Sequence, residues 1–253
     1  LVLTGKDCGL PERAPMCGIP YHAADNYITK LVNKGYSVAI GEQVEDPKTA
    51  KGLVKRSVIR VITPGTICAN EALDEDKNNY LMSVAYADGL FGVSTVDVST
   101  GDYYVTEIPD VRALYDEINR FMPSELIVND AFYNSEADIK LIKERWNVRV
   151  SEVNASYYDI EADRRLIEEH FHANAAGLGV GDMHAGIMAA GAVLKYVYDT
   201  QFSSVDYISE IKTYSTSEYM VIDTSTMRNL ELLESMRDKE KKGTLLWVLD
   251  KTR

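Results

Sequence analysis

Apolar residues in the first quarter of the chain recur with the spacing of a helix and then of short strands. Five of them fall at i, i+3, i+4, i+7 and i+8, namely Ala24, Tyr27, Ile28, Leu31 and Val32. This spacing places them on one helical face, and Gly35 is a typical residue for ending a helix. Two β-rich runs follow at 38–40 and 57–62, before the turn Thr63-Pro64-Gly65. Residues 1–66 are therefore predicted to form a small mixed α/β domain.

The pattern changes to that of a larger mixed sheet after residue 79. Three β-rich runs come first, at 81–87, 91–98 and 103–108, with Asp88-Gly89 and Ser99-Thr100-Gly101 as the turns between them. Helix-like and strand-like stretches then alternate, at 111–121, 126–128, 137–146, 148–153 and 160–172. A three-strand meander followed by this alternation predicts a mixed sheet with helices packed on it. We assign a linker to 67–79 and a second α/β domain to 80–181.

The last part of the chain has the pattern of helices alone. A loop rich in glycine and alanine at 174–181 is a plausible boundary. Beyond it, 185–198 reads as an apolar helix with small residues on one face, 227–236 as an amphipathic helix, and 244–249 as the start of another. We expect 182–253 to begin a separate helical domain.

Charge is distributed unevenly along the chain. The net charge is −12, which by itself disfavours a nucleic-acid partner. Residues 1–66, however, hold 9 Lys+Arg against 6 Asp+Glu, a net charge of +3, and the remainder carries −15. The first domain could therefore face an anion while the rest faces water or protein.

Two further features bear on the compartment. The longest apolar run, 187–194, is far shorter than the roughly 20 residues of a membrane-spanning helix, so a cytoplasmic protein without membrane contact is expected. Cys8, Cys17 and Cys68 are odd in number and lack C-x-x-C spacing, which disfavours both a disulfide framework and a zinc site.

Several motifs suggest chemistry, and each has a simpler structural reading. The glycines of 177–181 lack the Lys and hydroxyl of a phosphate-binding loop, so a hinge is expected. His170 and His172 alternate along a predicted helix and would point to different faces, which disfavours a metal site.

Three aspartates lie near predicted strand ends, and they leave a nuclease open as an alternative. Asp97, Asp102 and Asp130 occur in an element order like that of ribonuclease H, whose enzymes gather carboxylates around two metal ions. The simpler reading, which we favour, is that Asp97 and Asp102 cap the turn between them. A nuclease would require all three side chains to lie together.

The first domain also holds a Pro/Gly-rich segment at 14–22, predicted to be a loop, that includes Met16, Tyr21 and His22. Such a loop is costly to order unless it packs against or binds something. Basic residues occur on either side of it, namely Lys6, Arg13, Arg56 and Arg60. They could contact phosphates or form a solvated face.

Ordered sequence blocks resemble the bacterial MutS mismatch-repair family. The strongest are 14–23 (APMCGIPYHA), 26–32 (NYITKLV), 38–47 (VAIGEQVEDP) and 61–66 (VITPGT). Weaker blocks follow at 96–101, 223–231 and 243–252. The resemblance covers the whole chain, in matching order and spacing. It implies a mismatch-binding domain, a ribonuclease-H-like connector domain and the start of a helical lever.

The same resemblance implies recognition of mispaired or looped DNA. In the family a Phe-x-Glu motif enters the minor groove and the DNA bends, so that easily deformed mispairs are selected. That motif is expected upstream of Leu1, and the ATPase domain beyond this chain, which would make the chain a fragment. Lys6, Met16 and Arg56 match DNA-contact positions of the family, with Lys6 and Arg56 on phosphates. Gly41 stands where the family usually has cysteine.

For the connector, the resemblance implies docking of the partner protein MutL, with Arg164 and Arg165 at the partner-facing positions. We expect no catalytic residue, metal or cofactor in this chain. ATP and Mg²⁺ would belong to the full-length protein, which the resemblance implies is a homodimeric ATPase. A purely protein-binding module remains the other alternative to a DNA-binding fragment.

Overall fold

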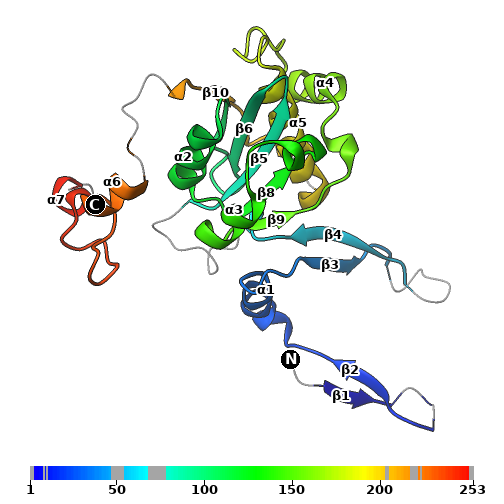
Figure 1. The fold of residues 1–253 in the computed structure, drawn as a ribbon. Helices are drawn as coiled ribbons and strands as arrows, with labels where there is room; N and C mark the ends of the chain where they lie inside the picture. Colours follow the sequence, from blue (N-terminus) through cyan, green and yellow to red (C-terminus); the bar gives the residue numbers. More distant parts are fainter. Residues whose placement is uncertain are drawn as a thin grey trace.

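Among the described residues, a six-stranded mixed sheet organises the middle of the chain (Figure 1). The computed structural model describes residues 3–7, 9, 11–46, 54–67, 78–202, 205–216, 222 and 224–250. The strands are β5 (Tyr80–Ala87), β6 (Leu90–Asp97), β7 (Tyr103–Ile108), β8 (Glu125–Val128), β9 (Arg149–Ser151) and β10 (Lys212–Thr213), in the spatial order β10-β7-β6-β5-β8-β9. The first three form the predicted antiparallel meander, and the other three join it in parallel. The prediction of a mixed sheet is confirmed, although β10 was not expected.

Helices cover both faces of this sheet. On one face lie α2 (Val111–Phe121) and α3 (Ile139–Trp146), and on the other lie α4 (Ile160–Phe171) and α5 (His184–Gln201). The central strand β5 shows why two layers are needed. Met82 and Val84 pack in the α2–α3 cluster, whereas Leu81 packs with α5 on the opposite face. Because strand side chains alternate, both faces of the strand are apolar and both must be covered.

Short polar side chains set the helix starts. Asp110, Asp138 and Asp159 each accept backbone N–H bonds from the first turn of α2, α3 and α4, which satisfies donors that the helix leaves unpaired. The same helices end at residues in the left-handed conformation, namely Met122, Asn147 and His172. These caps explain why the predicted bounds of α2 and α4 agree closely with the structure.

The helix α5 lies in the core of the second domain and does not begin a separate one. Its small residues let its backbone approach the sheet closely, since a Cβ at Gly92 of β6 would lie 1.9 Å from the Ala185 carbonyl oxygen. The Tyr103 hydroxyl donates a 2.5 Å hydrogen bond to the Ala190 carbonyl. Further along, β10 pairs with β7. The boundary expected at residue 181 is therefore corrected, because the small residues form a packing face.

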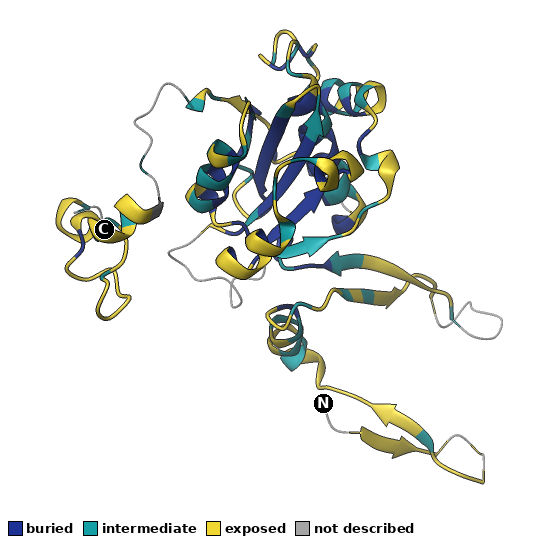
Figure 2. Cartoon of the chain, in the orientation of Figure 1, coloured by how far each residue is buried: buried dark blue, intermediate teal, exposed yellow. Residues whose placement is uncertain are grey.

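The first domain contains two separate hairpins. Its elements are β1 (Leu3–Lys6), β2 (Ala14–Cys17), the short 3-10 helix η1 (Tyr21–Ala23), α1 (Ala24–Val32), β3 (Val38–Gln43) and β4 (Arg56–Ile62). The predicted helix and the two predicted strands are present. Strand β2 was not predicted, and it occupies the first part of the expected loop at 14–22. Figure 2 shows the β1–β2 hairpin almost entirely exposed, in contrast to the buried six-stranded sheet.

The remaining elements are short. They are the 3-10 helices η2 (Asp130–Asn134) and η3 (Ala155–Tyr157) and the helices α6 (Thr224–Asn229) and α7 (Leu245–Leu249). The amphipathic helix predicted over 227–236 thus ends at Asn229. Of the helices that the structure describes, none combines the length and apolar character that a bilayer crossing requires. Cys17 is an exposed free thiol, whereas Cys8, Cys68 and most of the predicted linker lie outside the described residues.

Candidate nucleic-acid interface and connector surface

The β1–β2 hairpin brings two of the predicted DNA contacts onto one face. Lys6 pairs with Ala14, and Thr4 pairs with Met16. Alternate residues of a strand share a face, and directly opposed residues of an antiparallel pair point to the same side. Lys6, Thr4 and Met16 therefore share one face, with Lys6 exposed and 41% of Met16 accessible. A cation and a flexible apolar side chain are thus presented together.

Arg56 lies on the other hairpin. It is exposed at the start of β4, opposite Gln43 of β3. Arg60, further along β4, is half-buried, so the two arginines are not equivalent candidates for phosphate contact. The structure places Lys6 and Arg56 in different sheets, joined through α1. A surface that used both would extend over the two hairpins of the first domain (Figure 1).

Asp97 is occupied by the turn that follows β6. Its carboxylate accepts hydrogen bonds from the Ser99 N–H at 2.8 Å and the Ser99 hydroxyl at 2.6 Å, and from the Asn79 N–H at 3.0 Å. This is the turn-capping role that the sequence favoured.

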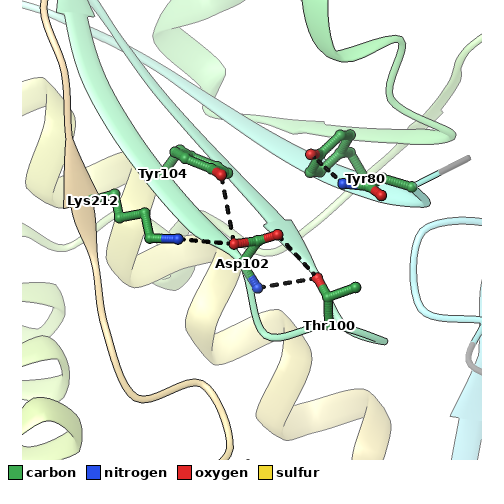
Figure 3. A network of polar contacts seen from close by, with 6 residues as sticks. Tyr80, Thr100, Asp102, Tyr104 and Lys212 are labelled. Carbon is green, nitrogen blue, oxygen red and sulfur yellow. Dashed lines mark hydrogen bonds and ion pairs between the residues drawn. The ribbon is translucent and has the colours of Figure 1, made fainter. Parts of the chain in front are cut away.

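Asp102 also contacts the turn, since its carboxylate accepts from the Thr100 hydroxyl at 3.4 Å, and it fastens β10 to the sheet (Figure 3). Lys212 donates to it at 3.0 Å, and the Tyr104 hydroxyl lies at 3.5 Å. The hydrogen bond to Asp102 raises the pKa of Lys212. The Lys212 ammonium also lies 5.4 Å from the centroid of the Tyr104 ring. Asp102 therefore has a structural role at the sheet edge.

The third aspartate lies at the opposite end of the sheet. Asp97 pairs with Tyr80 at the start of β5, whereas Asn129, the neighbour of Asp130, accepts from the Tyr86 N–H near the end of β5. Six residues of strand span about 20 Å. Across the described ranges, no group of three or more metal-ligating side chains occurs. Asp97, Asp102 and Asp130 therefore do not form the carboxylate cluster that the nuclease alternative requires.

The glycine loop and the histidine pair are likewise structural. The N–H groups of Gly177, Gly179 and Val180 donate to oxygen atoms of residues 174–176 within the loop, which leaves no open cradle of amides for a phosphate. His170 has both ring nitrogens in contact, one with the Tyr198 hydroxyl and one with the Ile208 carbonyl, each at 2.7 Å.

The two predicted partner-facing arginines have different environments. Arg164 is half-buried and donates to the Gly181 carbonyl at 3.2 Å, which ties α4 to the glycine loop. Arg165 is exposed and donates from Nε to the Glu161 carbonyl at 3.1 Å. The Glu168 carboxylate, one helical turn after Arg164, accepts from the Ala175 N–H at 2.8 Å. Only Arg165 is freely presented at the surface.

Comparison with known families gives the same two-part organisation. The family model described as MutS domain I matches residues 1–71, and MutS domain II matches residues 79–209. The chain belongs to the MutS family. The domain II match extends to residue 209 and so includes α5, in agreement with the core position of this helix.

Named relatives are similar over the whole chain. The proteins called DNA mismatch repair protein MutS are 54% identical in Lachnoclostridium phytofermentans, 48% in Ruminiclostridium cellulolyticum and 46% in Acetivibrio thermocellus, each over 100% of this chain. The chain spans 27 to 29% of the length of these relatives.

A buried carboxylate joins domain I to domain II. Glu125 of β8 is fully buried and accepts hydrogen bonds from the Gly65 N–H at 2.9 Å, the Tyr196 hydroxyl at 2.9 Å and the Ser151 hydroxyl. Burial and the nearby Glu125 carboxylate raise the pKa of Tyr196, so its hydroxyl remains a donor. Asn79 adds a bond to the Pro64 carbonyl at 2.9 Å. The end of domain I is thus held by polar groups of the connector.

Sequence reasoning missed this junction and one further buried acid. Glu125 precedes the apolar run Leu126–Val128, and Asp163 lies among the many charged residues of the helix expected at 160–172. Each is at most 1% exposed. The position of Glu125 directly before an apolar strand could have indicated that its carboxylate is buried. Nothing in the sequence distinguished Asp163 from the other charges of α4.

Proposed function

We propose that this chain is the DNA-contacting and connector part of a mismatch-repair protein that recognises mispaired or looped DNA by bending it. The consecutive matches to MutS domains I and II carry the proposal. The positive charge of residues 1–66, in a chain that is otherwise strongly acidic, supports a DNA-facing role for domain I.

In this proposal Lys6 and Arg56 contact phosphates and fix the position of the protein on the duplex. Met16 shares the face of Lys6 and supplies an apolar contact beside it. The Phe-x-Glu motif that reads the mispair does not occur in this sequence. Recognition of the mispair is therefore assigned to a part of the whole protein outside these 253 residues.

The connector is proposed to dock MutL through α4, with Arg165 as the accessible charge and Arg164 as its support. No catalytic residue and no cofactor are assigned to this chain. ATP, Mg²⁺ and homodimer formation belong to the full-length protein, and a cytoplasmic location is proposed for it.

The DNA proposal is tested by the salt dependence of binding. Lys6→Ala and Arg56→Ala should each reduce the slope of log K against log salt by about 0.9, because one counterion fewer is released. Lys140→Ala removes the same charge from an exposed site on α3 and is the matched control. Gel-shift titrations on matched and G·T-mispaired duplexes at three salt concentrations give these slopes.

Equal slopes for all four proteins would remove Lys6 and Arg56 from the interface. Without the Phe-x-Glu motif, we expect binding by this chain to differ little between the two duplexes. No binding to either duplex at low salt, with MutL binding retained, would favour the protein-interaction module instead.

A further inference from the structure

A groove of about 720 Å³ lies between α4 and α5, away from the proposed DNA contacts. The side chains that line it from α4 and α5 recur three or four residues apart, as expected of two helices packed side by side. The acidic residues and the Lys and Arg residues of the lining are Asp163, Arg165, Glu169, Lys195, Asp199 and Asp206. Acidic groups outnumber basic ones in this set, so the groove favours a cation.

Asp163 is the unusual member of the groove. It is 1% exposed, and its Oδ2 atom has no hydrogen-bond partner. It is held there by the helix packing, because a Cβ at Gly191 of α5 would lie 2.2 Å from the Asp163 Cβ. Buried polar atoms are nearly always hydrogen-bonded, since an unpaired one loses its interactions with water. A buried carboxyl that lines a groove and lacks a partner indicates that a donor is supplied from outside.

The bases nearby do not supply that donor. Lys195 donates from Nζ to the Ser156 carbonyl at 2.9 Å and lies 4.7 Å from the centroid of the Tyr157 ring. Arg165 donates from Nε to the Glu161 carbonyl. Burial raises the pKa of Asp163 to about 8, Lys195 opposes that shift, and Asp159 adds to it. The carboxyl is therefore mostly protonated at neutral pH until a cation arrives.

We propose that the α4–α5 groove is a binding site for an organic cation, an alkylammonium or guanidinium group whose N–H donors reach the Asp163 carboxylate. A metal ion fits less well, because no cluster of three ligating side chains occurs in the described part of the chain. An organic cation needs one carboxylate and a walled groove, and both are present. The site is independent of the DNA contacts and of the family's nucleotide chemistry.

The test is an NMR titration of the whole chain in an amine-free buffer. The probes are butylguanidinium, which represents an arginine side chain, spermidine, which represents a free polyamine, and tetramethylammonium, which carries charge without an N–H donor. The readouts are the Asp163 carboxyl carbon and the backbone amides of α4 and α5. We expect saturable shifts at Asp163 with one or both N–H donors and none with tetramethylammonium.

Two variants that each remove one carboxylate distinguish binding at Asp163 from general electrostatic attraction of the cation to the groove. Asp163→Asn should weaken binding by about tenfold or more, as expected when a charged hydrogen bond is lost. Glu169→Gln, an exposed residue of the same groove, should change the affinity less than about twofold. Cation binding at pH 7 should also release about 0.9 proton per site, because a group with a pKa of about 8 is mostly protonated there.

The comparison of probes identifies the source of the cation. Tighter binding of spermidine indicates a free polyamine, and tighter binding of butylguanidinium indicates a side chain of a protein partner. No saturable shift at Asp163, or equal affinity in wild type and Asp163→Asn, overturns the proposal. If Asp163→Asn fails to fold in a thermal melt, the wild-type carboxyl signal decides by itself.

Discussion

The backbone N–H of Gly65 donates a 2.9 Å hydrogen bond to the buried carboxylate of Glu125, 60 residues further along the chain. Both residues also pack directly, since a Cβ at Gly65 would lie 2.9 Å from the Glu125 Cβ. The contact joins the last turn of domain I to a parallel strand of the connector. It makes the position of one domain depend on the core of the other.

Replacing the carboxylate at this junction should weaken it. In Glu125→Gln an amide NH2 group that faced the Gly65 N–H would place donor against donor, and one that faced Ser151 and Tyr196 would require both hydroxyls to turn and accept instead. We expect a loss of about 1 to 3 kcal/mol in urea unfolding. Exchange of the Gly65 amide hydrogen should become faster as well. Glu136→Gln, at an exposed position, is the control, and equal stability of the two variants would contradict the junction's role.

The close approach of α5 to the sheet should be sensitive to a single methyl group. In Gly92→Ala the added Cβ would meet the backbone oxygen and carbon of Ala185 at 1.9 and 2.1 Å. Backbone atoms cannot rotate away, so α5 must shift, at a cost of about 1 to 3 kcal/mol or more. The control is Gly41→Ala, where the nearest atom is the Ser57 oxygen at 3.7 Å. Thermal melts showing the same small change for both would refute the tight packing.

Stability should depend on pH through Asp163. Burial raises its pKa to about 8 in the folded chain, whereas an unfolded Asp has a pKa of about 3.9. Between these values the folded state keeps a proton that the unfolded state has released, so stability falls as pH rises. Asp163→Asn lacks this loss. The free energy of unfolding of the variant, relative to that of wild type, should therefore rise by up to about 1.4 kcal/mol per pH unit from about pH 4 to 8. Urea unfolding of both proteins across that range measures the gain, and a constant difference would contradict it.

The two arginines of α4 should separate into a structural and a partner-facing residue. Arg164→Glu removes the bond to the Gly181 carbonyl and should cost about 1 kcal/mol. Arg165→Glu, at an exposed site, should stay within about 0.5 kcal/mol of wild type. If α4 docks MutL, Arg165→Glu should slow association, because charge complementarity acts mainly on the encounter. Unchanged MutL binding by a stable Arg165→Glu protein would count against docking at this helix.

The elements of the connector were predictable because local signals agree with the tertiary structure. The turn Asp88-Gly89 and the cap Asp110 fix the ends of neighbouring elements, and apolar periodicity fixes their faces. Strand β10 could not be predicted, since Lys212 and Thr213 pair only because β7 is already in place. The boundary expected at residue 181 was wrong for a similar reason. Small residues on α5 look the same whether they pack against a sheet or end a domain.

The candidate site residues were less predictable than the fold. Lys6 and Met16 share a face only through the register of a hairpin that the sequence did not indicate. Arg164 and Arg165 are adjacent in sequence, yet one ties α4 to a loop and the other points into solvent. Burial of Asp163 depends on Gly191, 28 residues away. Such differences arise from long-range packing, which spacing along the chain does not record.

The order of the strands also gives the connector a mechanical asymmetry. The chain arriving from domain I enters the sheet at β5, which is paired on both sides, and departs after β10, a two-residue strand at the edge. A pull on domain I therefore acts across all the hydrogen bonds of an interior strand at once. The departing chain is held at the edge by the two residue pairs between β10 and β7, by the Lys212–Asp102 ion pair, and by Tyr214, whose hydroxyl donates to the Glu117 carboxylate. The incoming chain is therefore attached inside the sheet and the outgoing chain at its edge, where a single short strand pair and the side chains beside it hold the connection.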